Sequence, residues 1–236
     1  MATIAENLSR IQSAKTDIKT AIEAKGVTVP SSATIDTYAT YVSQISGGGG
    51  GGTSYENELK GIIDRSITSI EIPSGITYVG QYSFYACQSL TDVVIPSGVE
   101  IIHFGAFQQC TSLSSVTMPN SVTQISDYAF ATCSTLSDIT ISEGVTVIGS
   151  NAFRGCALPT LTIPSTVTGI GGNAFRQCSS LTSITVNRTT PPSLGSNVFV
   201  DTNNCPIYVP AESVSTYQSA SGWSTYADRI QAIPNS

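Results

Sequence analysis

The sequence predicts a solenoid of mainly β structure, preceded by a short α-helical module. In the solenoid, about five to six coils with parallel strands stack at a period of 22–23 residues, with a capping segment at each end. Three observations support this fold class. A motif recurs at nearly constant spacing, aligned repeats place apolar residues in columns, and a run of six glycines separates the repeats from the N-terminal segment. A fixed period in this range is typical of a solenoid, because each unit buries its apolar edge only against its neighbours.

The recurring motif combines a proline, a phenylalanine and a cysteine. The prolines are Pro73, Pro96, Pro119 and Pro164, and Ser142 occupies the same place in one repeat. The phenylalanines are Phe84, Phe107, Phe130, Phe153 and Phe175, each followed three residues later by Cys87, Cys110, Cys133, Cys156 or Cys178. The step is 23 residues, except for one step of 22, where a residue is missing between Cys156 and Leu158.

The strands are predicted from apolar residues that alternate with mostly polar ones. We place them at about 68–72, 91–95, 114–118, 137–141, 160–163 and 182–186. They are expected to stack in parallel, and the proline after four of them ends the strand because it cannot donate to the ladder. On the return side of each coil, further columns of valine and isoleucine precede the phenylalanines.

Five of the six cysteines share one column of the repeat, while Cys205 lies outside it. Neighbouring coils of a parallel stack are about 4.8 Å apart, which is within the Cα separation that a disulfide tolerates. Five thiols cannot all pair, however. We therefore expect buried, free thiols that act as small core hydrophobes, and we expect Cys205 to be free as well.

The N-terminal segment predicts two short amphipathic helices, at about 3–25 and 33–45. The first has an apolar seam with heptad-like spacing, formed by Ile4, Leu8, Ile11, Ile18 and Ile22. Two helices of this size have a marginal core by themselves, so we expect them to need sister chains or a docking surface. The run from Gly47 to Gly52 favours no fixed path and is predicted to be a flexible tether.

These features divide the chain into five predicted segments: a helical anchor or oligomerisation module (1–46), a glycine-rich linker (47–54), an N-terminal cap (55–66), the repeats (67–186) and a C-terminal capping segment (187–236). Within the last segment we expect a degraded phenylalanine box at Phe199, a short strand at 206–210 and a helix at 211–220. Trp223, the only tryptophan, is expected to cover the open end of the stack.

Composition argues against several function classes. Charged residues make up 11% of the chain, the net charge is −6, and Lys and Arg do not cluster, so we expect no nucleic-acid partner. No apolar run approaches about 20 residues, so we expect no membrane insertion. No signal peptide is visible at the N-terminus, although one removed earlier would leave no trace.

No catalytic, cofactor-binding or metal-binding residues are predicted. His103, the only histidine, falls at a turn position with no acid and nucleophile beside it, and no Cys/His group has the spacing of metal ligands. The glycine run follows no strand, so it is a linker and not a phosphate loop.

Two surfaces remain as candidate binding sites. The first is the outward side of the strands, called the strand face: Glu71, Asp92, Thr117, Asp138, Thr140, Thr162 and Thr185. Threonine also suits an ordinary exposed strand, which is the plainer interpretation. The second surface is called the aromatic patch: Tyr78, Tyr82, Tyr85, Ile101 and Phe104. Clustered outward aromatics favour an interface with a sister chain or with the tethered helices; the alternative is that the rings pack on one another.

The repeat L-x-x-I-x-I-P-x-x-V-x-x-I-x-x-x-A-F-x-x-C-x-x-L resembles the BspA-like leucine-rich repeat family over about residues 59–233. That resemblance implies a leucine-rich-repeat solenoid that binds and does not catalyse, in a family found in bacterial surface adhesins, protist surface proteins and bacteriophage proteins. The segment from Ile4 to Pro30 is similar to a module at the start of tail and fibre proteins of phages that infect gut bacteria. This second resemblance implies an N-terminal anchor.

Together these inferences favour a non-enzymatic phage virion protein, such as a tail or fibre appendage. It would be held to other virion proteins through residues 1–46, would form a homo-oligomer (a trimer as a guess), and would display the solenoid to a bacterial surface receptor or for assembly. The alternative is a bacterial cell-surface or secreted adhesin. An enzyme is a distant third, and no cofactor is expected.

Overall fold

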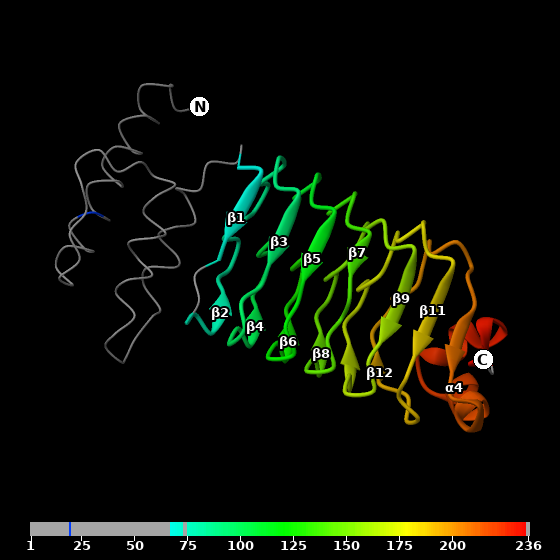
Figure 1. Ribbon diagram of the computed structural model, residues 1–236. Coiled ribbons are helices and arrows are strands. Elements are labelled where there is room, and N and C mark those ends of the chain that lie inside the picture. The colour runs from blue at the N-terminus through cyan, green and yellow to red at the C-terminus, as the bar shows by residue number, and fades with distance from the viewer. Residues whose placement is uncertain (1–18, 20–66, 73–74, 235–236) are drawn as a thin grey trace.

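The computed structural model describes residue 19, residues 67–72 and residues 75–234. The predicted anchor helices with their seam, the glycine linker and the N-terminal cap lie outside the described residues. The described part is a parallel β-solenoid of about seven turns with a period of about 23 residues, which confirms the predicted fold class (Figure 1).

One side of each coil carries the predicted strands. They are β1 (Ser69–Glu71), β3 (Asp92–Val94), β5 (Ser115–Thr117), β7 (Asp138–Ile139), β9 (Thr160–Ile163) and β11 (Ser183–Val186), followed by β13 (Ile207–Val209) and β14 (Ile230–Ala232). They form two four-stranded parallel sheets, in the orders β1-β3-β5-β7 and β14-β13-β11-β9. Inward side chains such as Val93, Val116 and Leu161 are buried, as the alternation predicted.

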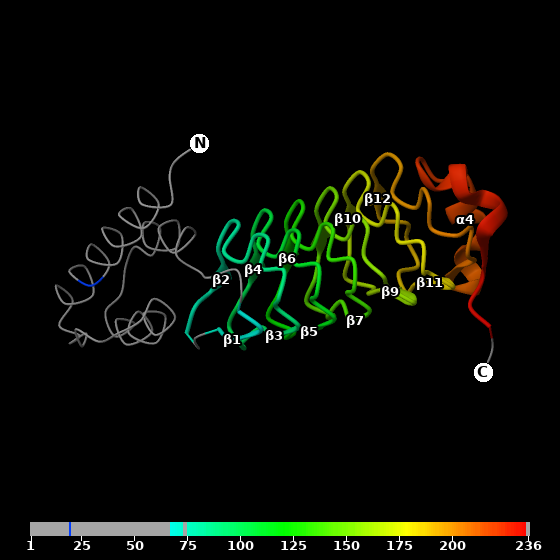
Figure 2. The ribbon, with the colours of Figure 1, turned by 90° about the horizontal axis from the view of Figure 1, so that it is seen from above.

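The return side forms a second layer of very short strands, which the sequence analysis did not predict (Figure 2). They are β2 (Tyr78–Val79), β4 (Ile101–Ile102), β6 (Gln124–Ile125), β8 (Val147–Ile148), β10 (Gly169–Ile170) and β12 (Ser193–Leu194). All six pair in parallel in one sheet. A strand of two residues has no alternation to detect, which is why only its buried column was visible in the sequence.

Stacked phenylalanines form the centre of the molecule. The rings of Phe84, Phe107, Phe130, Phe153, Phe175 and Phe199 follow one another with centroids 5.0–5.9 Å apart and nearly parallel planes. Each is buried. The last ring continues the stack beyond residue 186, as its place in a degraded phenylalanine box suggested.

All six cysteines are buried and free, which confirms the expectation for the thiols. Four of them donate through Sγ to the carbonyl of a phenylalanine in the preceding coil: Cys110 to Phe84, Cys133 to Phe107, Cys156 to Phe130 and Cys178 to Phe153, at 3.0–3.2 Å. The column is therefore a series of hydrogen-bonded core residues.

The C-terminal end of the stack is covered as expected. After β13 come η2 (Ala211–Ser213), α4 (Val214–Ser219) and η3 (Trp223–Arg229), and then β14, which the sequence analysis did not predict. Trp223 is fully buried, tilts against Phe199 at 5.8 Å and donates through Nε1 to the Pro192 carbonyl at 2.8 Å. Arg229 donates to the carbonyls of Cys205 and Phe199.

Candidate binding surfaces

The strand face is acidic and rich in hydroxyl groups. Asp92, Thr117, Asp138, Thr140 and Thr162 are exposed and Thr185 is half-buried, while the backbone of Glu71 lies in β1. Pairing places Asp92, Ser115 and Asp138 side by side, and Thr162 beside Thr185. The outward positions of β3, β5, β7, β9 and β11 include no lysine or arginine.

Neighbouring hydroxyl groups orient the carboxylates of Asp92 and Asp138. Thr91 donates through Oγ1 to Asp92 Oδ2 at 2.8 Å, and Ser115 donates through Oγ to Asp138 Oδ2 at 3.3 Å. Val94, which is 60% exposed, lies next to Asp92 and is the most exposed large apolar side chain of the described residues. The face thus offers fixed acceptors, free hydroxyls and the exposed isopropyl group of Val94.

The ladder of the strand face is interrupted between β7 and β9. In the intact coils, the residue that follows the leucine column donates to its counterpart in the preceding coil, as Ser114 does to Thr91 and Thr182 to Pro159. Pro159 occupies this position in the 22-residue coil and has no N–H to donate to Ser137. The missing residue and the proline together explain why the two strands separate here.

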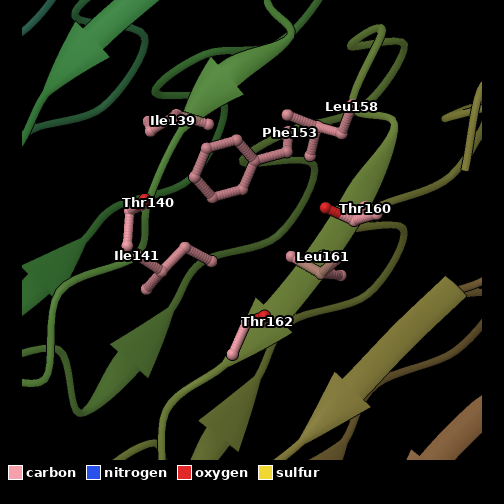
Figure 3. A pocket seen from close by; sticks show the side chains of 8 residues that line it. All are labelled: Ile139, Thr140, Ile141, Phe153, Leu158, Thr160, Leu161 and Thr162. Atoms are coloured by element: carbon pink, nitrogen blue, oxygen red, sulfur yellow. The ribbon is translucent and has the colours of Figure 1, made fainter.

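A notch opens at this interruption, with a volume of about 100 Å³. Its lining consists of Ile139, Thr140, Ile141, Phe153, Leu158, Thr160, Leu161 and Thr162. Figure 3 shows residues 139–141 along one wall, residues 158 and 160–162 along the other, and the Phe153 ring between them. None of the lining side chains is charged. The missing residue is visible in the sequence, but the notch that it opens was not predicted.

The aromatic patch is a set of rings that pack against one another. Tyr82 contacts Tyr85 and Phe104 edge to face, with centroids 5.6 and 5.2 Å apart. Phe104 also contacts Tyr128 at 5.3 Å, and Tyr78 contacts His103 at 5.2 Å. These rings and Ile101 are half-buried. Tyr128 thus joins the rings around Phe104, and His103 pairs with Tyr78; neither was assigned to the patch from the sequence.

Two tyrosines of this cluster adopt a backbone conformation that disfavours them. Tyr82 has φ 54° and Tyr128 has φ 60°, at a column that Gly105, Asn151, Asn173 and Asn197 occupy in other coils. The left-handed region costs a residue with a Cβ about 1–2 kcal/mol. Ring contacts of about 0.5–1.5 kcal/mol each can offset this cost. Whether the patch contacts a sister chain or the N-terminal helices stays a prediction.

Three observations bear on the chemistry of the described residues. They contain no group of three or more His, Cys, Asp or Glu side chains that could hold a metal ion. His103 lies against Tyr78 and is not simply exposed at a turn; partial burial lowers the pKa of its imidazole. Among residues 75–234 and the other described positions, no helix has the length and hydropathy to cross a membrane.

Comparisons with known proteins address the repeats. The family described as "BspA type Leucine rich repeat region" matches in six copies over residues 63–182 and 146–224. No curated protein matches the chain. A solved leucine-rich repeat protein of T. pallidum is 29% identical with a TM-score of 0.55, covering 60% of this chain and 68% of that one.

Two other solved structures are longer than this chain. A leucine-rich repeat protein from Bacteroides ovatus is 24% identical, with a TM-score of 0.47, and covers 57% of this chain and 43% of that one. A leucine rich cell surface protein from Faecalibacterium prausnitzii is 34% identical, with a TM-score of 0.44, and covers 53% and 40%. This chain therefore spans less than half the length of either protein.

Proposed function

We propose that this chain, which belongs to the BspA-type leucine-rich repeat family, is a non-enzymatic binding protein. It would be either attached to a bacterial cell surface or secreted as an adhesin. The solenoid is the scaffold and the strand face is the binding surface. The observation that carries this proposal is the strand face itself, which presents two oriented carboxylates and a row of exposed threonines without a basic residue.

The chemistry of this face indicates the class of partner. Complementary charge speeds association and selects partners more than it adds affinity. An acidic, hydroxyl-rich surface without cations therefore suits a cationic polypeptide or a neutral, hydroxyl-rich glycan, and it disfavours nucleic acid, whose phosphates need Lys and Arg.

Binding can be tested on arrays of glycans and cationic peptides with the full chain. The double variant Asp92→Lys/Asp138→Lys should lose at least tenfold in affinity for the ligands that the wild type binds. Glu143→Lys/Glu212→Lys changes the net charge equally at two exposed glutamates away from the strand face, and should bind normally. Equal loss in both variants, or no wild-type binding to any array ligand, would contradict the proposal.

A phage virion appendage is the second candidate, and the similarity of residues 4–30 to tail and fibre modules favours it. In this version the chain is a homo-oligomer, guessed to be a trimer, docked on other virion proteins through residues 1–46. The family match concerns the solenoid and supports the cell-surface version better.

Gold-labelled antibodies against the solenoid distinguish the cell-surface candidate from the virion candidate. Labelling of intact, unpermeabilised cells supports the first candidate, and labelling of purified phage particles supports the second. Deletion of residues 1–46 should abolish incorporation of the chain into phage particles if the chain is a virion protein.

A further inference from the structure

The notch between β7 and β9 leaves main-chain groups without partners inside an otherwise paired sheet. Asp138 N–H points to Ser114 of the preceding coil, so by alternation Ile139 turns its N–H and C=O toward β9. Thr160 and Thr162, by the same alternation, turn theirs toward β7. No pairing joins these two strands. Two edges that natural sheets usually cover therefore face each other across the notch.

The interruption is confined to the strand side. On the return side β8 and β10 remain paired, and Phe153 and Phe175 stack 5.4 Å apart. The coils are therefore held together behind the notch, where the Phe153 ring is fully buried. Ile139, whose counterparts Val93, Val116 and Leu161 are buried, is only half-buried here.

The lining matches the chemistry of a peptide. Among the apolar lining residues Ile139 is half-buried, whereas Leu158 and Leu161 are buried and the Phe153 ring behind them is fully buried. The rim carries the exposed threonines Thr140, Thr160 and Thr162, and unpaired amides lie along both edges. A peptide supplies a complementary set, namely an apolar side chain and backbone groups that can add to an open edge. No charged side chain lines the notch, so a charged group buried there would have no counter-ion.

The volume of the notch limits the size of the peptide side chain that it can hold. The notch has about 100 Å³, whereas an apolar cavity of about 150 Å³ in another protein admits benzene. A branched four-carbon group is therefore a better fit than an aromatic ring. Interfaces commonly place such an anchor in a pocket within a polar rim.

We propose that this notch receives one leucine- or isoleucine-sized side chain of an extended peptide segment in a protein partner, with the main-chain edges at Ile139 and Thr162 bonding the peptide backbone. The inference rests on the proposed function in one respect, that the strand face is the binding face.

The test uses peptide probes and methyl NMR on the full chain. N-acetyl-Thr-Leu-Thr-amide should shift the methyl signals of Ile139, Ile141, Leu158 and Leu161 saturably. N-acetyl-Thr-Ala-Thr-amide should bind at least tenfold more weakly, because it lacks the anchor. Thr162→Trp on the rim should abolish the shifts, whereas Thr216→Trp, at an exposed threonine of α4 outside the strand face, should leave them unchanged.

A second variant restores the regular coil. Inserting Ser after Cys156 and replacing Pro159→Ser returns the 23-residue spacing, and should close the notch and remove probe binding. Equal binding of the leucine and alanine probes, unchanged binding in Thr162→Trp, or tighter binding of methyl α-D-glucoside at the same methyl groups would overturn the proposal. The array experiment is separate, so either inference can fail alone.

Discussion

Individual side chains in this solenoid contact the preceding coil as well as their own. Four of the five cysteines of the column donate to a phenylalanine carbonyl of the preceding coil while filling space beside the ring stack. Burial raises the pKa of the thiols of Cys133 and Cys156 well above the usual value, and raises that of Cys178 to about 12. The thiolate is the reactive form, so these cysteines are structural and chemically inert in the folded state.

The raised thiol pKa makes stability depend on pH in the alkaline range. A thiol with a pKa near 9.0 in the unfolded chain and about 12 at Cys178 in the folded chain stabilises the fold fully below pH 9. Above pH 9 the unfolded chain releases the proton first, so the free energy of unfolding should fall as pH rises toward 12. Thermal melts between pH 8 and 11 measure this.

Cys178→Ala provides the control, because Tyr217, whose pKa burial also raises, contributes in the same direction. The variant should be less stable at pH 8 and should lose less stability than the wild type as pH rises. Parallel pH profiles of the two proteins would contradict the assignment.

At the scale of strands, regular positions could be predicted from the sequence and irregular ones could not. The strand columns were visible because side chains alternate, and the buried thiols because five share one column. The two-residue return strands were not visible, and neither were the contacts of Tyr128 with Phe104 and of His103 with Tyr78, since ring contacts depend on side-chain direction. Pro159 did carry a readable signal, because a proline at a donor position must break one ladder bond.

The open edges at the notch should be detectable by hydrogen exchange. The amides of Thr160 and Thr162 face β7 without pairing, whereas those of Ser183 and Thr185 face the paired strand β9. Because local opening spans free energies from near zero up to that of global unfolding, we expect Thr160 and Thr162 to exchange at least about a hundredfold faster. Ser183 and Thr185 are the controls, since they lie one coil further on. Equal protection of the two pairs would show that the ladder is closed in solution.

At the scale of the whole molecule, stability depends on neighbours. Each coil contacts the coil before it and the one after it, so an end without a neighbour exposes the ring stack. At the C-terminal end, Trp223 and Tyr226 both contact Phe199, and the Tyr226 hydroxyl accepts a hydrogen bond from the Phe199 N–H at 3.2 Å. The Arg229 guanidinium bonds the same region through Thr202 Oγ1 at 3.0 Å. The cap therefore replaces the coil that is missing at this end.

Removing the tryptophan should open this end of the solenoid. Trp223→Ala deletes a fully buried ring and its bond to the Pro192 carbonyl, and such truncations cost about 3–5 kcal/mol. Trp223→Phe keeps most of the apolar contact and loses the hydrogen bond, which costs about 1 kcal/mol. Urea unfolding measures both changes, and hydrogen exchange should show that the loss of protection in the alanine variant begins at β13 and the Phe199 turn.

Sedimentation velocity should then detect self-association of the Trp223→Ala variant through the exposed Phe199 ring, while Ser224→Ala, at an exposed neighbour, stays unchanged. If Trp223→Ala melted like the wild type and sedimented identically, the capping role of this segment would be wrong.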